Sequence, residues 1–386
     1  MSLADQRAPS ARRGAPAPAL TRPLARPFAS VECFADPAQA RAAWRELEPS
    51  GGAYQTLRFA QSWQAAFGAR LAIVVARDAA GQAAALLPLR LRRFGPLTSA
   101  GFLGDGWANY HMGLFRPGLV WSEADVRALL RAAGRSAGVD LFAFFNLPET
   151  WEGGDNLFAR LPGRASANAA FASALTATPT QWLDAHVSRA TQKKLRKKAR
   201  KLEAFGPVIH ARAADPAEAG RFLDALLDHK AAQARGRGVA DPFAARDVRD
   251  LLRGLIAGEA PAMEMHALLA GERAVAAFGA LAQGRRLSGL VVSYDSAPET
   301  AAATPGELLL IEVVRDAIAR GFETFDLGVG ESRYKNQMCE IEEPLRDCAF
   351  GVTALGRLAA PVFLASRAAR DAVKRRPGLM RLLQKA

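Results

Sequence analysis

Three β-like runs with very short connections constrain the fold of this chain most. They are MEMHALLAG, RAVAAFGALAQG and RRLSGLVVSYD within residues 263–295, and turns are expected at Gly271-Glu272 and Gly284-Arg285. Connections this short join only antiparallel neighbours, because parallel strands need a longer crossover. The segment therefore predicts an antiparallel meander at the centre of a sheet.

Further strands and helices are expected on either side of this meander. In chain order they are a strand at 206–213, helices at 215–234 and 241–257, a helix from about 304 to 320 and a strand at 322–329. The last helix begins with Thr-Pro-Gly-Glu, which predicts Thr304 as N-cap, Pro305 at the first position and Glu307 at the third. The order β-α-α-β-β-β-α-β predicts an α/β fold with a mostly antiparallel central sheet flanked by helices.

A similar unit precedes this one. We expect helices near 36–48, 57–67 and 122–137, and strands near 70–77, 82–92 and 140–147. The predicted organisation is a disordered Pro/Ala/Arg-rich tail (1–27), an N-terminal unit (28–186), a C-terminal unit (187–355) and a basic amphipathic tail (356–386).

The net charge of +13 is unevenly distributed. Residues 187–202 hold eight basic and no acidic residues, and the two ends of the chain are basic as well, so the remaining body is mildly acidic. This pattern favours local anion-binding sites over a nucleic-acid-binding surface, and DNA is the least favoured partner.

Composition excludes several other classes. Three cysteines and five scattered histidines predict neither a disulfide scaffold nor a metal site. The chain has no apolar run of the roughly 20 residues that a membrane-spanning helix needs, and its N-terminus lacks the apolar core of a secretory signal. We therefore expect a cytoplasmic protein, in peripheral contact with the inner membrane.

Four segments of the C-terminal unit carry a family resemblance. They are KKLRKKARKLEAFGPV, FLDALLDHKAAQARGRG, TPGELLLIEVVRDAIARG and FDLGVGESRYKNQM, within about 187–340. As a set they resemble the Gcn5-related N-acetyltransferase (GNAT) superfamily, in particular its cellulose-biosynthesis-associated CelD/BcsL-like branch, which is related to the Fem-type aminoacyl transferases. The resemblance implies two GNAT-like units in tandem and an acyltransferase active in polysaccharide or cell-envelope biosynthesis.

The resemblance implies acetyl-CoA or another acyl-CoA as donor. The strand at 287–295 would splay from its neighbour and offer the backbone of Val291, Val292 and Ser293 to the thioester. The following helix start would hold the pyrophosphate through Thr304, Pro305, Gly306 and Glu307. This start has one glycine where the usual GNAT loop has more, so an acyl-carrier or aminoacyl-tRNA donor stays open, as does a helix start without a ligand.

The loop at 328–335 is the expected catalytic segment. Two glycines follow a predicted buried strand, and polar residues come next. Related proteins resemble Gly-Asp-Glu-x-Tyr-Lys here, and this chain keeps Glu331, Tyr334 and Lys335. We expect Glu331 or Asp326 to accept the proton of the amine, Tyr334 to donate to the leaving thiolate, and Lys335 to steady negative charge. The alternative is a solvated loop with internal ion pairs.

The acceptor, a polar molecule with an amine or hydroxyl, is expected between the two units. Its candidate contacts are Trp107, Asn109, Tyr110 and His111 of the N-terminal unit and Tyr294 at the end of the splayed strand. Each of these side chains is also compatible with a structural role.

The basic helix near 189–201 and the C-terminal tail leave alternatives open. The helix is compatible with a solvated face, with an anionic ligand (coenzyme phosphates, a tRNA or a polysaccharide-linked lipid), or with nucleic-acid recognition, for which it lacks interleaved aromatic residues. The tail combines Val362, Phe363, Leu364, Leu379, Met380 and Leu382 with basic residues, which suits anionic lipid or a protein partner. Alternatives to acyl transfer from CoA are Fem-like transfer from aminoacyl-tRNA and an inactive GNAT scaffold that binds an anionic surface.

Overall fold

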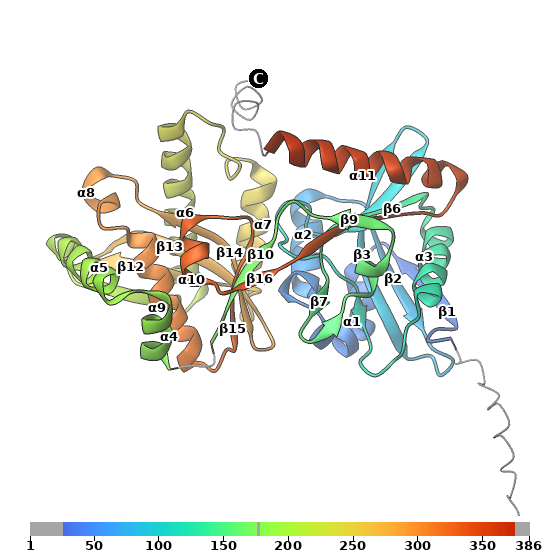
Figure 1. Cartoon of the computed structure of the whole chain (residues 1–386), viewed down its shortest axis with the longest axis horizontal. Helices are drawn as coiled ribbons and strands as arrows, with labels where there is room; N and C mark the ends of the chain where they lie inside the picture. The colour runs from blue at the N-terminus through green and yellow to red at the C-terminus, as the bar shows by residue number, and fades with distance from the viewer. Residues whose placement is uncertain (1–25, 176–177, 375–386) are drawn as a thin grey trace, which may run out of the picture.

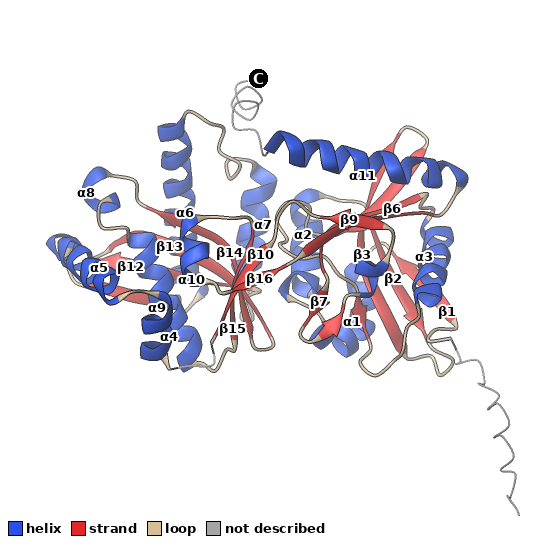
Figure 2. Cartoon of the chain, viewed as in Figure 1, coloured by secondary structure: helices blue, strands red, loops and turns tan. Residues whose placement is uncertain are grey.

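The computed structural model describes residues 26–175 and 178–374, which form two α/β units side by side (Figures 1 and 2). The sheet of the N-terminal unit contains β1 (Ser30–Phe34), β2 (Leu71–Arg77), β3 (Ala83–Phe94), β4 (Leu97–Phe102), β5 (Leu114–Phe115), β6 (Leu141–Pro148), β9 (Gly163–Ala165) and β17 (Leu345–Gly351). Its helices are α1 (Arg41–Leu47), α2 (Leu57–Phe67), α3 (Glu123–Ala137) and α11 (Ala354–Lys374).

The C-terminal unit is built on the second sheet. Its strands are β10 (Ala170–Ala174), β11 (Val208–Arg212), β12 (Met263–Ala270), β13 (Arg273–Gln283), β14 (Arg286–Tyr294), β15 (Thr324–Val329) and β16 (Ile341–Glu343). Its helices are α4 (Pro179–His186), α5 (Arg189–Leu202), α6 (Pro216–Arg237), α7 (Arg246–Ile256), α8 (Pro298–Ala301), α9 (Pro305–Ala319) and α10 (Arg333–Met338). A small hairpin of β7 (Thr150–Trp151) and β8 (Gly154–Asp155) belongs to neither sheet.

The predicted meander is confirmed. Strands β12, β13 and β14 are antiparallel neighbours, and their connections fall at the two predicted turns. Helices α6 and α7 precede the meander and α9 follows it, as the sequence indicates. The predicted α/β class with a mostly antiparallel central sheet flanked by helices is therefore confirmed.

The two sheets have the same strand plan. The orders are β1-β2-β3-β4-β6-β17-β9 and β11-β12-β13-β14-β15-β10-β16. In each unit two helices follow the first strand, and a 15-residue helix, α3 or α9, precedes the fifth strand of the sheet, which is parallel to the fourth. The two units therefore repeat one topology.

The two units exchange a strand. The sixth position of the first sheet is filled by β17, which comes from the end of the chain, and that of the second sheet by β10, which precedes the rest of its unit. Figure 1 shows these connections crossing the middle of the molecule. The predicted boundaries at 186/187 and 355 therefore do not coincide with the boundaries of the sheets, because long-range pairing and not chain order decides where each strand lies.

One buried apolar cluster continues across the junction. It includes Tyr54, Phe59 and Trp63 from the N-terminal unit and Leu251 and Met265 from the C-terminal unit. Helices α2 and α7 pack against each other there. Because this surface is apolar and buried, the relative position of the units is stabilised by the same effect that stabilises each core.

The structure covers only part of the two predicted terminal tails. Residues 1–25 and 375–386, which include Leu379, Met380 and Leu382, lie outside the described residues. Helix α11 packs on β17 and β6, where Phe363 and Leu364 are partly buried and Val362 is exposed. None of the described helices is both long enough and apolar enough to cross a membrane.

Candidate active site

Strands β14 and β15 separate soon after they begin. They pair in parallel only over Arg286–Ser288 and Thr324–Asp326. On its other edge, β14 pairs through Gly289 with Ala280 and through Val291 with Gly279, so Leu290 is an extra residue in the ladder. Such a bulge turns backbone groups out of regular pairing. The strand expected to splay therefore has both an open edge and a local irregularity.

A cavity of about 440 Å³ lies at the open end of these strands. Val292 and Tyr294 line it from β14, Thr304, Gly306 and Glu307 from the start of α9, and Tyr334 from α10. All six are residues that the sequence analysis selected. Of the other predicted donor residues, Val291 is buried in the core cluster at the junction, and Ser293 Oγ lies 3.2 Å from His229 Nδ1.

A second cavity, of about 370 Å³, extends this one toward α5. Lys198, Glu307, Arg333 and Gln337 line both, and Lys194 lines the second. The result is a groove that runs from the strand opening to cationic side chains. We call this the donor groove.

The start of α9 differs from the predicted capping box. Thr304 is the N-cap, but its backbone is left-handed, with φ +51°, and its side chain caps no amide. Its Oγ1 instead lies 3.4 Å from Lys198 Nζ. Pro305 has no N–H, and the N–H groups of Glu307 and Leu308 donate to the Thr304 carbonyl. This helix start therefore has few free amides, and the cations nearest to it come from α5 and α10.

Only one of the four predicted catalytic side chains lines the donor groove. Tyr334 does so, and burial raises the pKa of its phenol. Lys335 is buried, and its Nζ donates to the carbonyls of Gly328 (3.1 Å) and Val329 (2.9 Å), while burial lowers its pKa. Glu331 is exposed and accepts from Asn336 Nδ2 at 3.4 Å. The contacts of Lys335 thus brace the end of β15.

Asp326 lies fully buried between the units. Its Oδ1 accepts from the Tyr110 hydroxyl (2.9 Å) and the Gly328 amide (2.7 Å), and its Oδ2 accepts from the Ser288 hydroxyl (3.1 Å). The Arg286 guanidinium is 3.5 Å away. Burial raises the pKa of this carboxyl, and Arg286 opposes the rise. Because these neighbours occupy both carboxylate oxygens, the contacts of Asp326 are those of a residue that stabilises the structure.

Tyr294 lines the donor groove, and the predicted acceptor residues of the N-terminal unit separate into two groups. Trp107, Asn109 and Tyr110 contact the C-terminal unit, with the Trp107 ring 5.3 Å from that of Phe243. His111 instead lies in the N-terminal core, with Nδ1 2.7 Å from the Phe145 carbonyl oxygen. His111 therefore does not lie in the predicted acceptor pocket, because its side chain is packed in the core of the N-terminal unit.

Several residues of the site, Lys194 among them, were not predicted from the sequence. Lys198, Arg333 and Gln337 line the groove, and Leu290 forms the bulge. Helical spacing carried a signal for Lys198, since it lies on the side of α5 that holds buried Leu195 and Leu202. Leu290 had no such signal, because a bulge depends on the partner strand.

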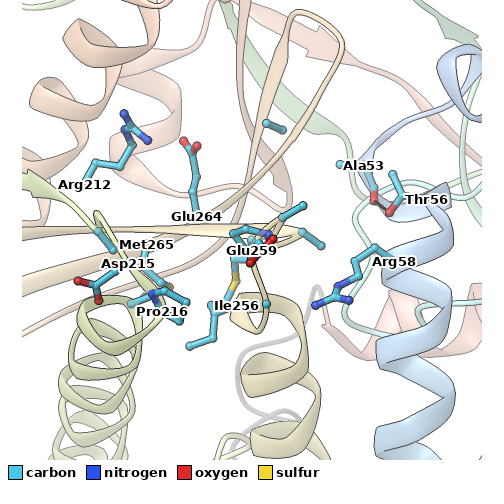
Figure 3. Close-up of a pocket in the computed structure, with 18 of the residues that line it drawn as sticks. Ala53, Thr56, Arg58, Arg212, Asp215, Pro216, Ile256, Glu259, Glu264 and Met265 are labelled. Carbon is cyan, nitrogen blue, oxygen red and sulfur yellow. Dashed lines mark hydrogen bonds between the residues drawn. The ribbon is translucent and has the colours of Figure 1, made fainter.

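A third cavity, of about 540 Å³, lies at the junction near the opposite end of β14 (Figure 3). Arg58 reaches it from α2, and Arg212, Asp215 and Glu264 line it from the C-terminal unit. It contains none of the predicted site residues and mixes both signs of charge. Among the described residues, no group of three His, Cys, Asp or Glu side chains is arranged to hold a metal ion.

Comparison with protein families assigns the C-terminal unit. Residues 189–336 match the family model described as Acetyltransferase (GNAT) domain. The matched segment runs from α5 into α10 and contains every residue that lines the donor groove except His186, Ser188 and Gln337. The chain thus carries a GNAT acetyltransferase domain, and the prediction of an acyltransferase is confirmed. No curated protein matches the chain in sequence.

Solved structures show the same fold over both units. FemX is 9% identical, with a TM-score of 0.58, over 85% of this chain and 98% of that one. L-PGS from Bacillus licheniformis is 13% identical, with a TM-score of 0.51, over 86% and 98%. The C-terminal domain of a putative lysylphosphatidylglycerol synthetase from Agrobacterium fabrum is 12% identical, with a TM-score of 0.50, over 86% and 95%. At these identities the likeness is one of fold alone.

Proposed function

We propose that the protein transfers an acyl group, typically acetyl, from acyl-CoA to an amine or hydroxyl of a polar acceptor. The observation that carries this proposal is the donor groove. It joins an open, bulged strand edge and a tyrosine at one end to Lys194, Lys198 and Arg333 at the other. A thioester attached to a phosphate-bearing carrier has the same order of chemical groups.

The proposed reaction is direct transfer. The acceptor nitrogen or oxygen bonds to the thioester carbonyl carbon, the carbon–sulfur bond breaks, and the thiolate takes a proton from Tyr334. The acceptor proton passes to water, and Tyr334 takes a proton back from water. Of the two predicted bases, Glu331 is exposed but lines a separate cavity with Asn168 and Glu340, and both oxygens of Asp326 are already hydrogen-bonded. Backbone N–H groups around Leu290 are suited to polarise the carbonyl.

A Fem-like transfer from aminoacyl-tRNA is the second candidate. One observation favours it: Lys193 and Lys197 of α5 are exposed on the side away from the groove, so the helix has cations beyond those that one coenzyme needs. An inactive scaffold that binds an anionic surface is the non-enzymatic alternative.

Calorimetry with CoA, acetyl-CoA and bulk tRNA distinguishes the three functions. We expect saturable acetyl-CoA binding that Lys194→Gln/Lys198→Gln weakens about 10-fold or more, from the loss of charge-assisted hydrogen bonds. The matched pair Lys193→Gln/Lys197→Gln removes the same charge on the exposed side and leaves acetyl-CoA affinity unchanged. Binding of tRNA alone, weakened by both pairs, would favour the Fem-like reaction. If neither the thioester nor tRNA bound saturably, the result would favour the inactive scaffold that binds an anionic surface.

The proposal extends to peripheral contact with anionic lipid at the cytoplasmic face of the inner membrane. Leu355, Leu358 and Val362 of α11 are 42%, 74% and 67% exposed at helical spacing. The only acid of this helix, Asp371, is buried and pairs with Arg164. Residues 375–386 add four basic residues and no acidic one.

Vesicle sedimentation tests the lipid contact. Vesicles of phosphatidylcholine with phosphatidylglycerol should retain the protein, those of phosphatidylcholine alone should not, and Leu358→Glu/Val362→Glu should release it. Equal binding to both vesicle types would contradict the contact. The CelD/BcsL-like branch, and with it a polysaccharide or cell-envelope acceptor, stays a proposal that rests on the sequence resemblance.

A further inference from the structure

A side chain of the N-terminal unit fills the point where β14 and β15 separate. Asn109 Nδ2 donates to the Gly289 carbonyl at 3.0 Å and to the Tyr54 hydroxyl at 2.7 Å. Asn109 Oδ1 accepts from the Val329 amide at 3.2 Å. Gly289 directly follows Ser288, the last residue of β14 that pairs with β15, and Val329 lies three residues after Asp326, the last residue of β15 that pairs with β14.

The Asn109 side-chain amide thus bridges β14 and β15 where their backbones no longer pair, in the way that a backbone peptide group would. A carboxamide has two donors and an acceptor, so it satisfies a carbonyl on one strand and an N–H on the other at the same time. Tyr54, which is buried, supports this arrangement, since its hydroxyl donates to Gly289 O at 3.3 Å. Leucine has a similar size but no such groups, and aspartate has acceptors only.

Gly289, which Asn109 contacts, is next to the bulge residue Leu290. The part of β14 that follows the bulge lines the donor groove through Val292 and Tyr294. A change in strand separation at Gly289 shifts that backbone directly. Because transferred groups must be held within a fraction of an ångström, small shifts of this kind act on turnover more than on binding.

We infer that Asn109 is a positioning residue that sets the separation of β14 and β15, so that the N-terminal unit completes the donor site of the C-terminal unit. This inference rests on the proposed acyl transfer. It gives the N-terminal unit a role in the reaction besides acceptor binding, and it explains why a residue outside the donor groove contacts both β14, which lines the groove, and the neighbouring β15.

The test combines two measurements on the full chain. Hydrogen exchange followed by mass spectrometry reports the protection of residues 287–293 and 327–331, and thiol release from acetyl-CoA reports turnover. In Asn109→Leu and Asn109→Asp we expect faster exchange in both segments and turnover lowered by about 100-fold, with acetyl-CoA affinity from calorimetry changed less than about 3-fold.

The matched control is Gln283→Leu. Gln283 Nε2 donates to the Glu48 carbonyl at 3.1 Å, so this variant also loses a hydrogen bond between the units, but at the far end of β14. It should keep wild-type exchange in both segments and wild-type turnover. If Gln283→Leu lost as much exchange protection and turnover as Asn109→Leu, Asn109 would be a general interface residue and the inference would be overturned.

The outcomes separate the inference from the proposed function. Faster exchange with normal turnover in the Asn109 variants would overturn the positioning role while leaving acyl transfer intact. Unchanged exchange would overturn the bridge itself. Wild-type protein that neither binds acetyl-CoA nor releases its thiol would overturn the proposed function, and the exchange data would still decide whether Asn109 holds the two strands.

Discussion

The Tyr110 hydroxyl donates a 2.9 Å hydrogen bond to Asp326 although 216 positions separate the two residues. Tyr110 belongs to the N-terminal unit, and Asp326 lies where β14 and β15 part. Both side chains are buried. The contact therefore joins the units at the point from which the donor groove opens.

Replacing Tyr110 with Phe removes this hydrogen bond and keeps the ring. We expect the free energy of unfolding to fall by about 1.5–3 kcal/mol, because the acceptor is a buried carboxyl group. Urea unfolding measures the change. Tyr294→Phe, at an exposed tyrosine, should change stability by less than about 0.5 kcal/mol. Equal stability of Tyr110→Phe and wild type would show that Asp326 does not depend on this donor.

Replacing Tyr334 with Phe tests the proton donor. Turnover of acetyl-CoA should fall by about 10²-fold or more, the usual contribution of a general acid, with little change in donor affinity. Steady-state thiol release and calorimetry measure the two quantities. A loss of affinity with unchanged turnover at saturation would assign Tyr334 to binding only.

The meander and the helix after it were predictable because their signals are local. Two-residue turns, alternating apolar residues and Thr-Pro-Gly-Glu act over a few positions. The exchange of β10 and β17 was not predictable. The position of a short strand such as Ala170–Ala174 depends on partner residues that lie 150 or more positions away in the chain. The role of Asn109 was hidden for the same reason: its residue type was noticed, but its partners Gly289 and Val329 belong to the other unit.

Thr304 holds strain at the start of α9. A left-handed backbone costs an L-residue roughly 1–2 kcal/mol, and a β-branched one is rare there. Thr304→Gly should raise the free energy of unfolding by about 0.5–1 kcal/mol after the entropy that glycine loses on folding. The substitution also removes the oxygen near Lys198 Nζ, so acetyl-CoA affinity should fall as stability rises. Denaturant unfolding and calorimetry measure both; a destabilised Thr304→Gly would argue against strain.

A histidine pair makes stability depend on pH. Burial, with His266 close by, lowers the pKa of His210 to about 4, and the two rings meet through His210 Nε2 and His266 Nδ1 at 3.1 Å. As pH falls from 6.5 toward 4, the unfolded chain takes up a proton here that the folded protein does not. Stability should therefore fall over this range, by about 1–2 kcal/mol because solvent screens part of the effect.

The variant His210→Gln should flatten this part of the pH profile. Glu264 acts in a lower range: burial raises its pKa, but hydrogen bonds from His266 and Arg320 outweigh burial and lower it to about 2. Its stabilising effect is lost only below about pH 4.5. Burial also lowers the pKa of His111 and His229, so it is the comparison of wild type with His210→Gln at pH 7 and pH 5 that isolates His210. An equal pH dependence in the two proteins would refute the assignment.

Two glycines at the end of β15, Gly328 within the strand and Gly330 just after it, provide a matched pair for the contact between the units. Gly328 and Gly330 have φ of +73° and +94°, so alanine at either position pays a similar backbone cost of roughly 1–2 kcal/mol. A Cβ on Gly328 would overlap the Asn109 amide, whereas one on Gly330 would meet nothing within 4 Å. Gly328→Ala should therefore lose more stability than Gly330→Ala in urea unfolding. It should also lose acetyl-CoA turnover, because the displaced Asn109 no longer joins Gly289 to Val329. Equal turnover in the two variants would mean that the N-terminal unit stabilises the fold without taking part in the donor site.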